Sequence, residues 1–125
     1  MSKHESILES TKESLSIPTE IKDFDAILID HINSTFSYLH ELGLGPDEGY
    51  EIAGSENTWD EYIGSPLYND VRSLMMLKIR LLFDPPGIGA VINSLNSKID
   101  EYEWRLCNKQ EVMGWIPAQQ TWTNL

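Results

Sequence analysis

The sequence has little cysteine, little positive charge and no long apolar run, and each shortage narrows the class of protein. Its one cysteine, Cys107, cannot form an internal disulfide, and no Cys/His spacing typical of a zinc site is present. Residues 1–16 are polar and lack the apolar core of a signal peptide. No apolar run approaches the ~20 residues that span a membrane. We therefore expect a protein of a reducing compartment, with no membrane contact, made in the cytoplasm.

Basic residues are scarce, since 9 Lys and Arg stand against 20 Asp and Glu and give a formal net charge of −11. Proteins that wrap nucleic acid bind it by neutralising phosphates, so this charge disfavours such a function. An acidic surface keeps a protein soluble, and it also repels DNA that passes close to it. The charge therefore predicts either a solubilising surface or one that faces DNA without holding it.

The residue patterns of common catalytic sites are missing as well. His4, His31 and His40 have no metal-ligand spacing, and the glycines of residues 43–49 do not form a phosphate-binding motif. Cys107 has no histidine near it in the sequence that would activate its thiol. We predict no catalytic residue, no cofactor and no metal site, and hence no enzyme.

Helical periodicity is the main pattern that the sequence does contain. With 125 residues and 41% hydrophobic content, the chain can form one domain with its own core. Apolar residues recur at steps of three and four, which predicts an all-α fold, a small helical bundle. The predicted helices cover residues 4–15, 23–42, 66–83 and 88–108. Asp23 or Asp25 is expected to cap the second helix, and Gly43 to end it.

The two longest apolar patterns meet at a corner, Asp84-Pro85-Pro86-Gly87. Proline forbids helical geometry at the residue before it, and the glycine lets the chain turn. So short a connection predicts two long antiparallel core helices. We expect these helices to form the centre of the core, with five of their residues buried: Leu74, Leu82, Val91, Leu95 and Ile99.

Residues 46–58 form a predicted loop or arm, rich in glycine and acidic residues. Tyr50 and Ile52 alternate within it and are candidate contacts with another protein. Thr58 and Glu61 have the spacing of a capping box, which predicts a short helical turn after the arm.

The C-terminal segment breaks the helical period at Gly114 and Pro117. We therefore divide the chain into a helical bundle, residues 1–109, and an extended tail, residues 110–125. Trp115 and Trp122 are costly to expose, so the tail is expected to become ordered on a protein partner. In the alternative interpretation, Trp115 folds back over the open end of the bundle.

Three stretches carry a resemblance to a known family: "DFDAILIDHINSTFSYLHELGLGPDEGYEI", "WDEYI" and "VRSLMMLKIRLLFDPPGIGAVINSLNSKIDEYEWRLC". Together they resemble the head–tail connector (adaptor) proteins of tailed double-stranded DNA phages that infect Gram-positive bacteria. The resemblance covers roughly residues 15–107, and its most specific elements are "HINSTF", "LGLGP", "LLFDPP" and "EYEWRL".

The resemblance implies a virion protein of the phage neck, assembled in the host cytoplasm. Such adaptors form a ring, usually a dodecamer, under the portal protein; the ring extends the DNA channel and docks the stopper or tail-completion protein. DNA would pass through without specific binding. In this sequence the portal contacts would come from the tail, at Met113, Trp115, Ile116, Pro117 and Trp122. Tyr50 and Ile52 would contact a neighbouring subunit or the stopper.

Two other classes of function are consistent with the same residues. The chain could be a stand-alone acidic helical module, a regulator or inhibitor that binds one protein partner. A small enzyme is the third hypothesis, and it lacks a recognisable site. The assembly mass distinguishes the first two, because a connector joins a large ring and a module stays monomeric or dimeric.

Overall fold

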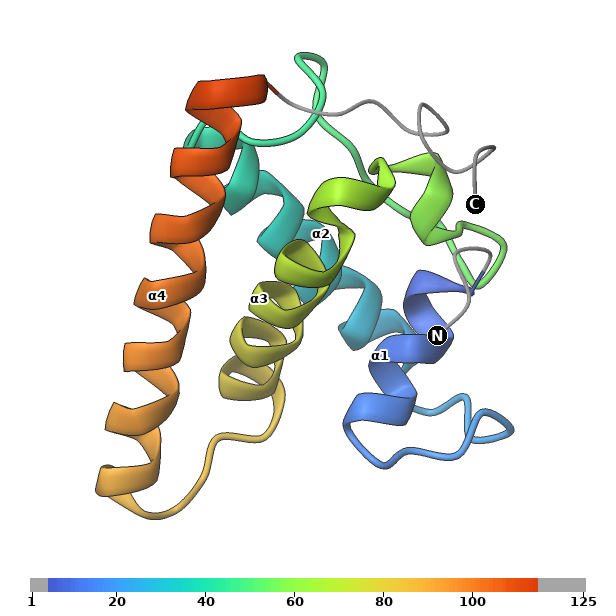
Figure 1. Ribbon diagram of the computed structural model, residues 1–125. Coiled ribbons are helices and arrows are strands. Elements are labelled where there is room, and N and C mark those ends of the chain that lie inside the picture. Colours follow the sequence, from blue (N-terminus) through green and yellow to red (C-terminus); the bar gives the residue numbers. More distant parts are fainter. Residues whose placement is uncertain (1–4, 115–125) are drawn as a thin grey trace.

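The computed structural model describes residues 5–114, and this part of the chain is helical (Figure 1). It forms no β-strand there, only an isolated bridge between Ser6 and Thr58. The prediction of an all-α bundle is therefore confirmed. The helices are α1 (Ile7–Ser14), α2 (Asp25–Glu41), the short 3-10 turn η1 (Trp59–Glu61), α3 (Ser65–Phe83) and α4 (Gly89–Met113).

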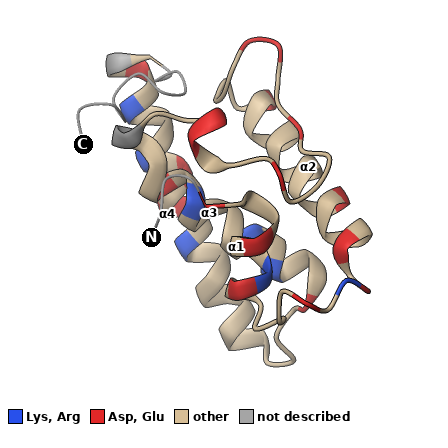
Figure 2. Ribbon diagram, turned by 90° about the vertical axis from the view of Figure 1, so that its right-hand side faces the viewer, with Lys and Arg blue, Asp and Glu red and all other residues tan. Residues whose placement is uncertain are grey.

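Helix α3 lies at the centre of the molecule. It packs against α2 on one side and most extensively against α4 on the other, while α1 packs against α2. Figure 1 shows α2 behind α3, and Figure 2, turned by 90°, shows α2 on one side of the molecule and α4 on the other. The residues of α3 that are buried in the core are Leu67, Tyr68, Val71, Leu74, Met75 and Ile79.

The start of α2 differs from the prediction, and its end agrees with it. The N-cap is Phe24, which provides no side-chain hydrogen bond, and Asp25 instead pairs with Lys12. Gly43, at φ +84°, takes the left-handed conformation after the helix. Its amide donates to His40 O at 3.0 Å, and the Leu44 amide donates to Leu39 O at 2.9 Å, the two bonds of a Schellman cap.

The corner between α3 and α4 is confirmed. Helix α3 ends at Phe83, and α4 begins at Gly89 after the Asp84-Pro85-Pro86-Gly87 corner. The two helices run antiparallel (Figure 1). Because Pro85 excludes helical geometry at Asp84, the chain must turn here, and the short link keeps both helices side by side.

The predicted burial of the two helices that flank the corner is partly wrong. Leu74 and Ile99 are buried and Leu95 is half-buried, but Leu82 is 53% exposed and Val91 is 40% exposed. Helix α4 has 25 residues and is about 37 Å long, so it extends beyond the neighbours that could cover it. It therefore flanks the core instead of sharing its centre. It also continues to Met113, so that residues 110–113, predicted as tail, are helical.

A buried lysine holds the connection between α1 and α2. Lys12 is 1% exposed, and its Nζ donates to Thr19 O at 3.1 Å, Ile21 O at 2.5 Å and Asp25 Oδ1 at 2.8 Å. All three donors of the ammonium group are thus used, which offsets the cost of removing a charge from water.

Leu74→Ala is expected to lower the free energy of unfolding by about 2–5 kcal/mol, because it leaves a cavity in the core. Leu82→Ala removes the same atoms from an exposed position on α3 and should cost less than about 1 kcal/mol. Urea denaturation of both variants measures the difference. Equal costs would contradict the assignment of the buried face of α3.

Lys12→Met is expected to lower the free energy of unfolding by about 1–3 kcal/mol, since it leaves two carbonyls and a carboxylate without their charged donor. Arg105→Met is the matched control, because Arg105 pairs with Glu101 at 2.6 Å on the surface. An exposed pair of this kind contributes about 0.5 kcal/mol or less. If thermal and urea unfolding give the two variants the same stability, the Lys12 cage is not a stabilising element.

Candidate interaction surfaces

Large apolar side chains are exposed at the end of the molecule where α3 turns into α4. Leu82, Ile88 and Val91 flank the corner, with Ile88 65% exposed. Two further apolar residues, Phe24 and Ile27, are exposed at the start of α2. An edge-to-face contact of 5.5 Å between the rings of Phe24 and Phe83 joins this start to the end of α3. Exposed apolar groups that gather in this way are typical of protein–protein contact sites.

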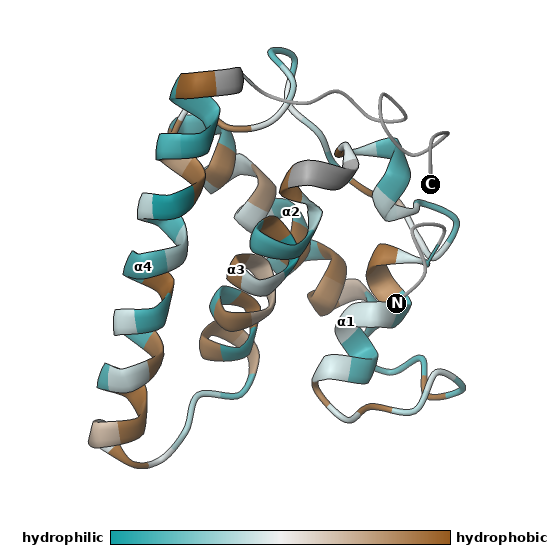
Figure 3. Ribbon diagram, in the orientation of Figure 1, coloured by the Kyte–Doolittle hydropathy of each residue, from teal (hydrophilic) through white to brown (hydrophobic). Residues whose placement is uncertain are grey.

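Helix α4 exposes two more apolar residues along its length, Trp104 at 70% and Val112 at 87%. Figure 3 shows hydrophobic segments near both ends of this helix. Trp104 was not predicted as a contact residue, although it lies off the stripe of Ile99, Tyr102 and Leu106 that faces α3. A tryptophan outside the apolar stripe of its helix was the signal that could have found it.

The portal contacts predicted in the tail fall mostly outside the described residues. Met113 is the last residue of α4, and Trp115, Ile116, Pro117 and Trp122 lie beyond the described range. Val112, beside Met113, is therefore the last apolar side chain whose exposure the structure describes, and it is exposed to solvent.

Helix α4 is tied to α2 across the surface of α3. The hydroxyl of Tyr38 donates a hydrogen bond to the carboxylate of Glu103. The ammonium group of Lys78 lies 3.7 Å from the centroid of the Tyr38 ring. Burial and the neighbouring Glu103 carboxylate raise the pKa of Tyr38 well above its ordinary value. The phenol therefore stays protonated and keeps donating, which fixes the position of α4 relative to α2.

The arm, residues 46–58, is anchored to α2 by an asparagine. The Asn33 side chain donates to Ile52 O at 3.0 Å and accepts from Ile52 N at 2.8 Å. These two hydrogen bonds are the same pair that a neighbouring β-strand would make with the backbone of Ile52. Ile52 itself is 4% exposed, so its side chain packs within the subunit.

Tyr50 fixes the arm from a second direction. Its ring packs edge-to-face on Phe36 at 5.1 Å and lies 5.0 Å from the ring of Tyr62. Its hydroxyl donates to Glu61 Oε1 at 3.2 Å. Burial, followed by the charge of Glu61, raises the pKa of Tyr50 to about 12, so the phenol remains neutral. The predicted capping box of Thr58 and Glu61 is present at this place.

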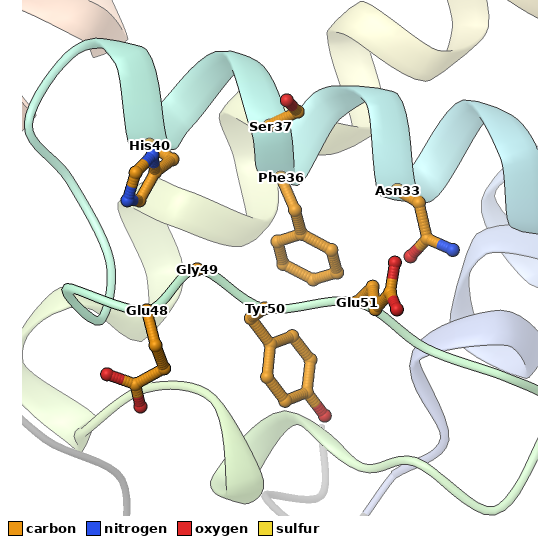
Figure 4. A pocket seen from close by; sticks show the side chains of 8 residues that line it. All are labelled: Asn33, Phe36, Ser37, His40, Glu48, Gly49, Tyr50 and Glu51. Atoms are coloured by element: carbon orange, nitrogen blue, oxygen red, sulfur yellow. The ribbon is translucent and has the colours of Figure 1, made fainter.

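A groove of about 680 Å³ runs between α2 and the arm (Figure 4). Asn33, Phe36, Ser37 and His40 line it from α2, and residues 48–51 line it from the arm. The predicted contact residues Tyr50 and Ile52 thus lie under the arm, while its exposed side chains include four carboxylates, Asp47, Glu48, Glu51 and Glu56. A partner that reaches the arm meets carboxylates first.

Metal ligands, a reactive cysteine and membrane-spanning helices are three further features that would indicate other classes of function. No group of three or more His, Cys, Asp or Glu side chains within residues 5–114 could hold a metal ion. Burial, together with Glu103 and Glu111, raises the pKa of the Cys107 thiol, which makes this cysteine less nucleophilic. None of the described helices is long and apolar enough to cross a membrane.

Asn33→Ala is expected to lower the free energy of unfolding by about 1–3 kcal/mol, because it leaves the amide and carbonyl of Ile52 without partners. The Ile52 amide should also exchange its hydrogen faster, as the arm opens more often. Ser37→Ala, on the rim of the same groove, is the control and should change neither quantity. Unchanged exchange at Ile52 in Asn33→Ala would show that the arm is held by its aromatic contacts alone.

Comparison with known proteins identifies a family. The profile of a family described as "Phage connector protein" matches residues 7–113. No curated protein and no solved structure matches the chain significantly. The matched range begins at the first residue of α1 and ends at the last residue of α4. The chain belongs to the phage connector protein family.

Proposed function

We propose that this chain is a head–tail connector, or adaptor, of a phage virion. Several copies form a ring under the portal protein, and this ring extends the DNA channel and docks the stopper or tail-completion protein. The observation that carries the proposal is the family match, which spans every helix of the bundle.

The exposed apolar residues support assembly into a ring. Leu82, Ile88 and Trp104 are 53%, 65% and 70% exposed, and covering the apolar area that remains in water is worth about 25 cal/mol per Å². Contacts between copies would cover them. A dodecamer is the ring that the resemblance to adaptors of phages of Gram-positive hosts implies.

The net charge of −11 supports a channel that does not hold DNA. A negatively charged surface displaces no counterions from DNA and gains no affinity for it. The ring would therefore guide the DNA without binding it. The stopper would then close the channel from the tail side, and the connector would supply its docking surface.

The tail and the arm are the proposed partner contacts. Met113, Trp115, Ile116, Pro117 and Trp122 reach the portal, because Trp and Met are enriched in the centres of interfaces. Tyr50 and Ile52 serve a neighbouring subunit or the stopper through the arm that they anchor.

A truncation after Gly114 tests the tail. It removes Trp115 and Trp122 and leaves the whole of α4, so the free energy of unfolding should change by less than about 0.5 kcal/mol. The truncated protein should no longer co-purify with the portal protein of the same phage, whereas the full chain should. A loss of several kcal/mol would assign the tail to the subunit core, and retained portal binding would remove its docking role.

The mass of the complex distinguishes a ring-forming connector from the competing interpretation, a stand-alone binding module. Native mass spectrometry of the full chain with the portal should give a ring of many copies. A complex with one or two copies of this chain would favour the regulator or inhibitor.

A further inference from the structure

Charge is distributed unevenly between the two sides of the molecule. Every Asp, Glu, Lys or Arg in residues 23–71 is acidic, whereas most of the basic residues lie between Arg72 and Lys109. Figure 2 shows acidic positions along α2 and the loop that follows it, and basic positions on α3 and α4, where acidic positions of α1 and α4 lie near them. In a protein with a net charge of −11, α3 is thus a helix in which cations outnumber carboxylates, since Arg72, Lys78 and Arg80 stand against Asp70.

A groove of about 350 Å³ lies between α1, α3 and α4. We name it the basic groove; three cations line it, Arg72, Arg80 and Lys98, and no carboxylate is among its lining residues within the described chain. Arg80 and Lys98 are exposed, and neither lies within ion-pair distance of a carboxylate of residues 5–114.

Arg72 also has unused hydrogen-bonding capacity. Its only ion pair among the described residues is a long one, 3.9 Å from Nη2 to Glu5 Oε1. Its Nε is buried and has no hydrogen-bond acceptor in the described part of the chain. A second copy cannot reach the buried Nε, but the long ion pair leaves the guanidinium charge weakly compensated, which favours an added carboxylate nearby.

The arm has the complementary chemistry. Asp47, Glu48 and Glu51 are exposed, and no basic side chain of the described residues pairs with them. The arm is also held in place by Asn33 and Tyr50. Its carboxylates are therefore presented on a fixed backbone, which lowers the entropy lost on binding.

We propose that the basic groove of one copy binds the acidic arm of a second copy of this chain. The inference rests on the proposed function, since it names the surfaces that join neighbouring subunits of the ring. The arm lies beside α2 and the groove opens between α1, α3 and α4, so the contact joins different faces of the two copies. Contacts of this head-to-tail kind form closed rings or open filaments and leave every interface identical.

DNA phosphate is the other anion that three cations could attract. The net charge of −11 repels a polyanion such as DNA, which must approach the surface along its length. An acidic loop of a second copy has the same charge chemistry, and its carboxylates are exposed. The favoured occupant is the arm.

A charge swap tests the proposal. Arg80→Glu combined with Lys98→Glu makes the groove acidic, and Glu48→Lys combined with Glu51→Lys makes the arm basic. The control pair, Lys22→Glu with Arg105→Glu, changes the net charge as much as the groove variant but lies outside the groove. Self-association of the isotope-labelled full chain is measured at low salt from concentration-dependent amide chemical shifts, up to about 1 mM, where weak contacts become visible.

The wild-type chain and the control should self-associate, and each swapped variant alone should bind itself at least about tenfold more weakly. An equal mixture of the two swapped variants should restore association, because every groove then meets an arm of opposite charge. This rescue also excludes misfolding as the cause of the loss.

Three results would overturn the proposal: no self-association of the wild type up to about 1 mM, swapped variants that associate like the wild type, or no rescue in the mixture. A short DNA duplex is added as a further probe. If it binds the wild type but not the groove variant, and self-association is absent, the groove is a phosphate site. None of these results bears on portal co-purification, so the proposed connector function is tested separately.

Discussion

The fold depends on the burial of one wide apolar face of α3. Leu67, Val71, Leu74 and Ile79 of this helix are buried, and the helix packs against both α2 and α4. The corner at Pro85 and Pro86 then holds α4 antiparallel to it. Because the core is already filled by α1, α2, α3 and η1, α4 finds only one side to pack against. The exposed residues of the connector follow from this arrangement.

The sequence predicts the elements better than it predicts their surroundings. The three- and four-residue periods located each helix, and the chemistry of Asp84-Pro85-Pro86-Gly87 located the corner. Val91 and Leu82 follow the same periods as Ile99 and Leu74, yet they are exposed. A period identifies the face of a helix that is apolar, but whether a neighbour reaches that turn depends on the lengths and paths of other segments.

Polar residues in the interior were missed for a related reason. Lys12 and Asn33 look like solvent-exposed positions in the sequence, and both hold a connecting segment through backbone carbonyls or amides. Which backbone groups come within their reach is decided by the path of a loop, which no local pattern specifies. Trp104 was overlooked because it belongs to neither the apolar stripe nor the tail.

These features together describe a subunit whose unsatisfied surfaces fit an assembly. The apolar groups at the corner and Trp104 are exposed, and the cations Arg80 and Lys98 have no carboxylate at ion-pair distance within the described chain. A rigid arm and a long outer helix are suited to repeated contacts, and a family of phage connectors is a class of protein in which such contacts are expected.

The central claim is that copies of this chain form the ring between portal and tail. Cryo-electron microscopy of the phage neck measures this most directly. The account predicts a ring of this helical bundle under the portal, with Leu82, Ile88 and Trp104 covered by neighbouring proteins. A neck in which no copy of this chain lies between the portal and the stopper would contradict it.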